Sequence, residues 1–324
     1  MDLSLSKEDE DDIDAVFVEK DWIGIGKKYD DSLPAVVQLE KQARLIIPER
    51  FLTCAKLPAP TLPVFNFIES TLPRISSEII STRIQTWFSC DSPSIDYGTF
   101  LSRSIPAHSF VIGLSEAVGQ AWLNGAQSVI DCRFNDGHDR LPLWVISFWM
   151  KIIELHEVQS FWKKSITWLE NEERRLGAKG VTLEDLPAVR KLLHTSIAWD
   201  SKMPYCRGMT STSQLSRFLG TRWLSDDNVN MMIEELVLDH QEEMEERHIQ
   251  LLSLNFSIAI SNIEVNLAQS SSTRERTLLG RIERQVNVED LERLYFPTHV
   301  TGTHWIAGEI NFRKKTFAFG EFHV

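Results

Sequence analysis

The sequence predicts an α+β protein in which a mainly helical N-terminal region is followed by a smaller part that mixes helix and strand. Three observations support this fold class. Apolar residues recur at mostly helical spacing between positions 141 and 169. An amphipathic helix is expected directly after Trp223. Three β-rich runs, 295–300, 305–312 and 316–319, follow towards the end of the sequence.

The composition is that of a globular protein and argues against several functional classes. With 324 residues, of which 43% are hydrophobic and 25% charged, the chain can bury a substantial core in one or two domains. Its 46 acidic against 34 basic residues give a net charge of -12, which disfavours a general affinity for nucleic acid or an anionic membrane. The most apolar stretch, 141–153, has about 13 residues. A membrane-spanning helix needs roughly 20.

The cysteines give no sign of a disulfide framework or a metal site. Cys54, Cys90, Cys132 and Cys206 lie far apart, without a CxxC pair or clustered histidines. No cofactor is predicted. The N-terminus opens on an acidic run, without the basic and apolar segments of a signal peptide. These features predict a protein of a reducing compartment, the nucleus or the cytoplasm.

Four segments are predicted along the chain. Residues 1–14 form an acidic tail, expected to be disordered because such a charge run buries too little apolar surface to offset its ordering entropy. Residues 15–205 form a tryptophan-rich, mainly helical region. Residues 206–219 are polar and rich in turn formers, which predicts a linker. Residues 220–324 form the α+β part.

In the helical region, prolines interrupt the chain up to about residue 104, and the clearest helix there is expected at 75–87. The periodic segment 141–169 predicts two packed helices. A further helix is expected at 182–194, capped near Thr182 with Glu184 in its first turn. The periodic segment carries four tryptophans, Trp144, Trp149, Trp162 and Trp168. Aromatic residues at this spacing favour a core over a base-stacking or peptide-binding surface.

In the α+β part, the helix after Trp223 has acidic residues at its N-terminal end, where the helix dipole favours them. Residues 251–267 alternate loosely in polarity and predict a strand. Residues 270–276 predict a surface loop, and residues 288–294 a short helix. The three β-rich runs complete this part.

The last two β-rich runs are separated by the polar Arg313-Lys314-Lys315, which is typical of a hairpin turn. Such a hairpin brings the start of one strand beside the end of the next, so His304 and Glu321 are expected within a few ångströms of each other. A carboxylate beside a histidine orients one ring nitrogen and favours the imidazolium, leaving the other nitrogen for a thiolate. Taken alone, such a pair is more often a surface ion pair than a catalytic dyad.

Two motifs of the α+β part are similar to those of the Ulp/SENP family of ubiquitin-like-protein proteases. The first, Trp223-Leu224-Ser225-Asp226, resembles the Trp-Leu-Asn/Ser-Asp opening before a helix in that family. The second begins at Tyr295-Phe296-Pro297-Thr298-His299-Val300 and continues with His304-Trp305, a strand, a Lys-rich turn and a strand ending in an acid. It resembles the family's catalytic His-Trp and acid segment in the same order. The resemblance covers about residues 220–324.

The resemblance implies a truncated papain-like, Ulp-type cysteine protease domain. In it, His304 is the general base partner and Glu321 takes the position usually held by Asp. Trp223 and Asp226 lie near the groove for the tail of the ubiquitin-like protein, and Trp305 flanks the substrate channel. The implied partner is SUMO or another ubiquitin-like protein, and proteolysis is the implied reaction.

The sequence departs from the family pattern in three ways. Glu321 replaces Asp, a change shared by the distantly related adenovirus protease, and Phe322 stands where Ser usually follows the acid. The larger departure is the nucleophile, because the family's oxyanion-hole Gln and its Cys follow the acid, whereas the last cysteine here is Cys206. We therefore expect a domain truncated before its nucleophile and inactive alone, with a second chain as one source of the missing half.

Three hypotheses of function remain open at this stage. The leading one is a fragmentary or diverged Ulp-like cysteine peptidase. The second is a catalytically dead module that binds a ubiquitin-like protein through Trp223, Asp226 and Trp305. The third is a helical interaction protein whose function resides in residues 15–205. Exposed tryptophans in the periodic segment would favour the third.

Overall fold

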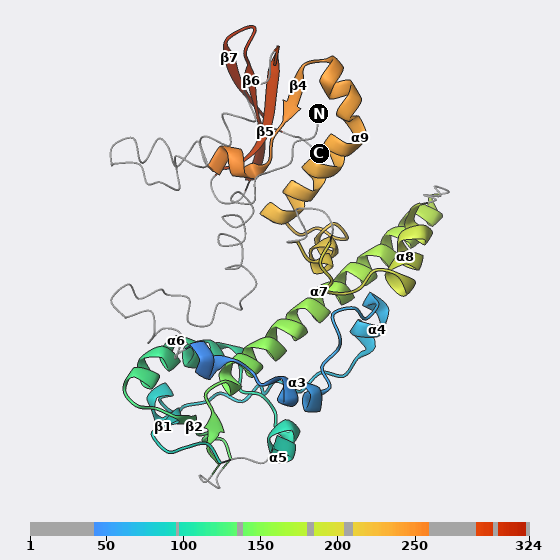
Figure 1. Cartoon of the computed structure of the whole chain (residues 1–324). Helices are drawn as coiled ribbons and strands as arrows, with labels where there is room; N and C mark the ends of the chain where they lie inside the picture. The colour runs from blue at the N-terminus through green and yellow to red at the C-terminus, as the bar shows by residue number, and fades with distance from the viewer. Residues whose placement is uncertain are drawn as a thin grey trace, which may run out of the picture. The chain divides into compact units, whose positions relative to one another are not determined.

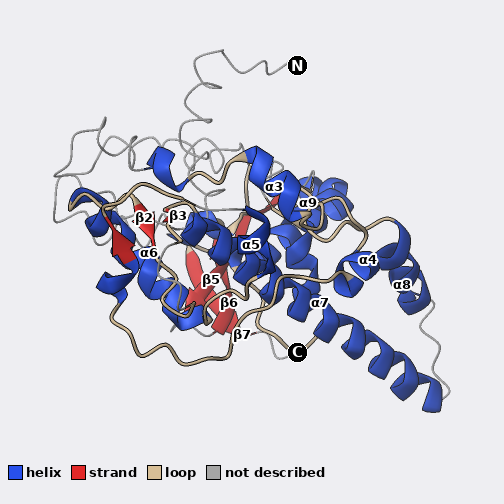
Figure 2. Ribbon diagram, turned by 90° about the horizontal axis from the view of Figure 1, so that it is seen from below, coloured by secondary structure: helices blue, strands red, loops and turns tan. Residues whose placement is uncertain are grey.

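The structure is a computed structural model that describes residues 42–94, 97–134, 139–179, 185–203, 210–258, 290–300 and 304–321. It mixes helices with two sheets, in agreement with the predicted α+β class (Figures 1 and 2). The chain divides into two compact units. Unit 1 comprises Met1–Ala59 and Asn66–Ser160, and unit 2 comprises Pro60–Phe65 and Phe161–Val324. The predicted acidic tail, 1–14, and the predicted loop, 270–276, lie outside the described residues.

Unit 1 combines short helices with a small sheet. The helical elements are α3 (Glu49–Ala55), the 3-10 helix η1 (Ile84–Trp87), α5 (Tyr97–Ser102) and α6 (His108–Leu123), while α4 (Val64–Glu69) begins in unit 2 and ends in unit 1. The antiparallel sheet has the order β1 (Phe88–Ser89), β2 (Ser128–Val129) and β3 (Leu141–Pro142). The sequence pattern does not predict this sheet, because strands of two residues are too short to show alternation.

The core of unit 1 is rich in aromatic side chains. Phe51 packs against Trp144 and Phe148, with ring centroids 4.6 and 4.9 Å apart. Three of the four tryptophans that the periodicity assigns to a core are buried, Trp144 and Trp149 in unit 1 and Trp162 in unit 2. Trp168 is half-buried. The prediction of core tryptophans is therefore confirmed for these three positions.

One helix, α7 (Val145–Ala178), takes the place of the two helices predicted over 141–169. It has 34 residues, and no glycine or proline occurs in it before Gly177, so nothing in the sequence stops the helix midway. The boundary between the two units falls inside α7, after Ser160. The helix thus supplies side chains to the cores of both units.

The helix predicted over 75–87 is wrong, since only η1 at its end is helical. Ile75 instead pairs with Ile105 in a parallel bridge. The Ser76 N–H donates to the Ile105 carbonyl at 2.8 Å, and the Ile105 N–H donates to the Arg74 carbonyl at 2.8 Å. Because these backbone groups are hydrogen-bonded to a segment about thirty residues away, they are satisfied without the hydrogen bonds of a local helix.

Unit 2 includes the second half of α7, from Phe161 onwards. The helix α8 (Asp185–Thr195) confirms the one predicted over 182–194, although Thr182 and Glu184 lie outside the described residues. Phe65 stacks on His194, with ring centroids 3.3 Å apart and planes 8° from parallel. The buried Trp162 donates its indole N–H to the Trp199 carbonyl at 3.3 Å.

The described part of the predicted linker, 210–219, is packed rather than extended. It contains the 3-10 helix η3 (Thr212–Arg217), and both Thr210 and Ser216 are buried. The Ser165 hydroxyl of α7 donates to the Ser216 carbonyl at 2.6 Å. Hydroxyl-rich segments predict turns, but the same hydroxyls also satisfy buried backbone groups, which composition alone cannot distinguish.

The sheet of unit 2 follows the helix α9 (Asp226–Glu246). Its order is β4 (Ile249–Leu251), β5 (Arg293–Val300), β6 (His304–Asn311) and β7 (Thr316–Glu321), with β4 parallel to β5 and the other pairs antiparallel. The three predicted β-rich runs and the hairpin between the last two are confirmed. Of the strand predicted over 251–267, only Leu251 is a strand residue among those described, as the end of β4, and the prediction is wrong over 254–258, which is helical. The helix predicted at 288–294 is wrong at its end, because β5 begins at Arg293.

The hydrogen bonds of the sheet fix which backbone groups each strand directs to its neighbours. The Phe312 N–H donates to the Glu292 carbonyl at 2.9 Å, so even-numbered residues of β5 and β6 bond to each other. Odd-numbered residues of β6 therefore bond to β7, and odd-numbered residues of β5 turn away from β6. The Leu252 N–H, which donates to the Tyr295 carbonyl at 2.9 Å, agrees with this. Pro297 stands at one of these positions and has no N–H.

The core of the sheet lies on one of its faces. Leu252, Phe256, Leu294 and Phe296 are buried together, and Ile310 packs against them. Phe256 and Phe296 meet edge to face with centroids 4.8 Å apart. Side chains alternate along a strand, so the opposite face of β5 and β6 carries His299 and Trp305.

Candidate functional site

The first candidate motif forms the N-terminus of α9. Ser225 is the N-cap, and its hydroxyl accepts the Asn228 N–H at 3.4 Å while the Asn228 side-chain oxygen accepts the Ser225 N–H at 3.1 Å. This reciprocal capping box satisfies two backbone donors that a helix start otherwise leaves free. Asn228 is fully buried and also donates to the Gln214 carbonyl at 2.9 Å. The start of α9 is therefore fixed to η3.

Trp223 and Asp226 are presented to solvent by this fixed helix start. The Trp223 side chain is 67% exposed, the largest exposed fraction among the tryptophans described. Asp226 is the first residue of α9 and is exposed. An exposed tryptophan on a rigid element is a common anchor for a protein partner, because its large ring buries much apolar area at small entropic cost.

Trp305 joins the first motif to the second. Its indole N–H donates to the Leu224 carbonyl at 3.4 Å across a sequence separation of 81 residues. Its ring stacks on His299, the residue opposite it in β5, with centroids 4.4 Å apart and planes 22° from parallel. The two motifs predicted from sequence are thus adjacent in space.

His304 is the first residue of β6, where it pairs with Val300 and is half-buried. Glu321 is the last residue of β7 and lies opposite Ile306. Positions 304 and 321 are therefore diagonal neighbours of the ladder, at a Cα separation of about 7–8 Å in a regular antiparallel pair. The side chain of Glu321 lies outside the described atoms, so contact between its carboxylate and His304 stays a prediction. No hydrogen bond or ion pair among the described residues joins Trp223 or Asp226 to His304.

Arg222, which sequence reasoning missed, holds the first motif against α7. Its guanidinium carbon lies 4.4 Å from the centroid of the Phe161 ring, and one nitrogen donates to the Ser216 carbonyl at 2.7 Å. Burial, together with the nearby positive charge of Arg217, lowers the pKa of Arg222. A signal was present, because Arg222 directly precedes Trp223, but its partners come from elements far away in sequence.

The cysteines of the described chain do not form a nucleophile site. Cys54 and Cys90 are exposed, and Cys132 is half-buried. Burial raises the pKa of the Cys132 thiol, which makes the thiolate scarcer rather than more abundant. Cys206, in the predicted linker, lies outside the described residues.

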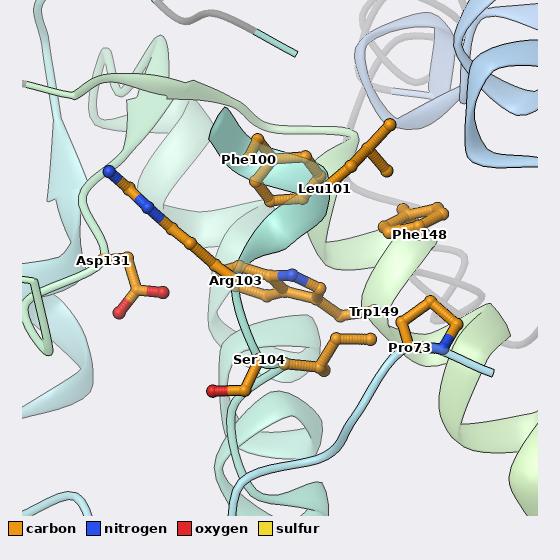
Figure 3. Close-up of a pocket in the computed structure, with 9 residues that line it drawn as sticks. Pro73, Phe100, Leu101, Arg103, Ser104, Asp131, Phe148 and Trp149 are labelled. Atoms are coloured by element: carbon orange, nitrogen blue, oxygen red, sulfur yellow. The ribbon is translucent and has the colours of Figure 1, made fainter. Parts of the chain in front are cut away.

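Unit 1 contains a small cavity (Figure 3). Its volume is about 10 Å³. That is room for no more than one water. Phe100 and Trp149 form its apolar side, and Arg103 and Asp131 lie at its polar side. The Asp131 carboxylate forms an ion pair with the buried Arg133, with the two charged groups 2.6 Å apart. Its charge is therefore balanced within the core of unit 1.

Among the described residues, no group of three or more histidine, cysteine, aspartate or glutamate side chains is placed to hold a metal ion. None of the helices described is both long enough and apolar enough to cross a membrane. Comparison with known proteins adds no relative: no family model, no curated protein and no solved structure matches this chain.

Proposed function

We propose that residues 220–324 belong to a Ulp/SENP-type, papain-like cysteine peptidase domain and bind the C-terminal region of SUMO or a related ubiquitin-like protein. One observation carries this proposal. The motif at Trp223 and the motif at His304 and Trp305, which resemble that family independently in sequence, are brought together by the bond from Trp305 to the Leu224 carbonyl. Unrelated chance matches would have no reason to be adjacent.

The chemistry proposed for the site follows from the hairpin. His304 and Glu321 stand at diagonal positions of adjacent strands, and we propose that a direct or water-mediated hydrogen bond joins them. The carboxylate would orient the imidazole and favour its protonated form. The other ring nitrogen of His304 would then pair with a cysteine thiolate, which attacks the carbonyl carbon of the scissile amide at the end of the ubiquitin-like tail. The C–N bond breaks, the tail remains on sulfur as a thioester that water later hydrolyses, and the His304 imidazolium gives its proton to the leaving amine.

The chain is proposed to bind without cleaving. No cysteine follows Cys206 in residues 1–324, whereas the family order places the nucleophile after the acid. A histidine and a carboxylate without a thiolate leave the covalent step without its nucleophile, and the parts of such a site act as a unit. A second chain that supplies the thiolate is one partner this proposal allows.

The binding module is the second candidate function, and the exposed Trp223 favours it. The helical interaction hypothesis is less well supported, because Trp144, Trp149 and Trp162 are buried. Binding through Trp223, Asp226 and Trp305 requires neither a cysteine nor Glu321. The two remaining candidates share their ligand and differ only in whether a completed site cleaves it.

The binding proposal is tested by biolayer interferometry of the full chain against immobilised SUMO, with ubiquitin alongside. We expect Trp223→Ala to raise the Kd by at least about tenfold, since an exposed aromatic anchor often contributes more than 1.4 kcal/mol. Leu238→Ala is the matched control, because Leu238 is an apolar residue of α9, the helix that follows Trp223, and is 61% exposed. It should leave the Kd unchanged. Equal losses from both variants, or no binding to either protein, would contradict the proposal.

A fluorogenic SUMO substrate and a thiol-reactive SUMO probe test the catalytic part. We expect no turnover and no covalent adduct from residues 1–324. Turnover abolished by His304→Ala, with the adduct mapped to Cys54, Cys90, Cys132 or Cys206, would show that the order of catalytic residues is wrongly assigned.

A further inference from the structure

The strand β7 is the outermost strand of its sheet among the described residues, at one side of the four strands (Figure 1). Ala318 bonds to Glu309 of β6, because odd-numbered residues of β6 direct their backbone groups to β7. By alternation, the N–H and C=O groups of Phe317 and Phe319 point away from β6. The edge therefore presents a row of backbone donors and acceptors that no strand of the described part of the chain receives.

The side chains of this edge strand are unusual for an exposed edge. Phe317 and Phe319 are 54% and 57% exposed, and their rings contact each other with centroids 4.4 Å apart. They lie on the same face as the buried Phe296, whose ring centroid is 6.2 Å from that of Phe317. Between Thr316 and Gly320 there is no charged residue or proline. Soluble proteins normally protect an exposed edge with such residues.

The sequence of this edge is complementary to itself. Reading outwards from Ala318, the flanking pairs are Phe317 and Phe319, then Thr316 and Gly320, then Lys315 and Glu321. When two such strands run antiparallel with Ala318 opposite Ala318, each Phe317 meets a Phe319 and each Lys315 meets a Glu321. Aromatic pairs and opposite charges are the cross-strand combinations that stabilise antiparallel pairing.

We propose that β7 pairs antiparallel with β7 of a second copy of this chain, about a two-fold axis at Ala318, so that two sheets join into one. The hydrogen-bond pattern permits this register, because Phe317 and Phe319 are the residues whose backbone groups face outwards and they become partners of each other. This inference does not rest on the proposed function, although Glu321 takes part in both.

The two neighbouring symmetric registers fit less well. Centred on Phe317, the pairing sets Lys315 against Phe319. Centred on Phe319, it sets Phe317 against Glu321. Both registers lose the two ion pairs that symmetry creates, and each places a charge against a ring. A two-fold pairing uses the same edge on both copies, so it closes as a dimer.

The test is sedimentation velocity on the full chain over a concentration series. We expect a reversible shift from a 37.2 kDa monomer to a species of twice that mass. Phe319→Lys places a charge inside the paired face and should leave only monomer. Phe312→Lys, at an exposed phenylalanine of the preceding turn, should leave the equilibrium unchanged. Monomer at every concentration, or a dimer that Phe319→Lys leaves intact, would overturn the proposal.

Charge reversal tests the register itself at Lys315, the last residue of the turn before β7, and at Glu321, the last residue of β7. Lys315→Glu creates two like-charge pairs by symmetry and should raise the dimer Kd by about tenfold, whereas Lys314→Glu should not. Combining Lys315→Glu with Glu321→Lys restores opposite charges and should restore the dimer. Failure of the double variant to recover, while circular dichroism matches the parent, would reject the Ala318 register.

Discussion

Gly308 lies in β6 beneath the ring of Phe296, in the small core of the unit 2 sheet. A Cβ at this position would stand 2.5 Å from the Phe296 Cζ atom, closer than real Cβ contacts come. Phe296 is buried, so its ring cannot turn out to solvent. The glycine therefore lets two strands share the space that one aromatic ring fills.

We expect Gly308→Ala to lower the free energy of unfolding of the sheet by about 1–3 kcal/mol, because overpacking forces the ring or the backbone to move. Gly320→Ala, one strand away with nothing within 4 Å of its added Cβ, is the control and should have little effect. Chemical denaturation followed by far-UV circular dichroism measures both. Equal stability of the two variants would refute the close approach.

Cys132 offers a second prediction at the scale of one residue. Its pKa is raised by burial, so a smaller fraction of this thiol is ionised at a given pH than for an ordinary cysteine. We expect iodoacetamide to modify the exposed Cys54 and Cys90 before Cys132, and the Cys132 rate to keep rising at higher pH. Mass spectrometry of tryptic peptides at pH 7 and pH 9 measures this order. Faster labelling of Cys132 would contradict it.

At this scale, the bond from Trp305 to the Leu224 carbonyl brings together two motifs that are each visible in the local sequence, while a site shared by Trp223 and His304 stays a prediction. Sequence reasoning did not find Arg222, Arg133 or Gly308. Each of these depends on a partner brought by the fold: Phe161 for the first, Ser104 for the second and Phe296 for the third. Nothing in the sequence next to these residues indicates such a partner.

Among the elements, α9 shows how a helix start is set by few atoms. Ser225 and Asn228 form the capping box, and Asn228 also ties the helix to Gln214 of η3. We expect Ser225→Ala to lower the free energy of unfolding of unit 2 by about 1 kcal/mol and Ser225→Thr to retain most of it, because only the second keeps a hydroxyl acceptor. Thermal unfolding by circular dichroism distinguishes them. Equal melting temperatures would mean that packing alone fixes this end.

Elements were predictable where their signal is local. The hairpin of β6 and β7 follows from two β-rich runs and a basic turn, and the helix after Trp223 follows from its amphipathic pattern. The segment 75–87 misled because its apolar residues have helical spacing, while its backbone bonds to the segment around Ile105. The sequence predicts two helices where the structure has the single helix α7, although no glycine or proline interrupts α7 before Gly177.

On the scale of the whole molecule, the two units differ in how much they bury. The largest fully buried side chains of unit 1 include Trp87, Trp149, Phe51 and Phe148. The sheet of unit 2 has a core of four buried residues. Apolar area removed from water is the main favourable term in folding, so the sheet is expected to be the less stable part.

We therefore expect unfolding in two steps. In hydrogen exchange measured at increasing urea, peptides covering 293–321 should lose protection before peptides covering 145–155, since multi-domain chains need not unfold as one unit. Gly308→Ala should advance the first step only. Loss of protection at a single urea concentration for both regions would show that the chain unfolds cooperatively.

Pro297 makes the two sides of the unit 2 sheet unequal in the backbone donors that they offer. On the side of β5 away from β6, β4 pairs with three residues, and the next position that could offer an N–H is this proline. The part of β5 beyond β4 therefore lacks one N–H donor, whereas β7 has no proline. A fibre needs a fully paired edge on both sides of every subunit, and Pro297 weakens one of these two sides. Raising the concentration should therefore yield pairs and then saturate, without the turbidity and thioflavin signal of amyloid.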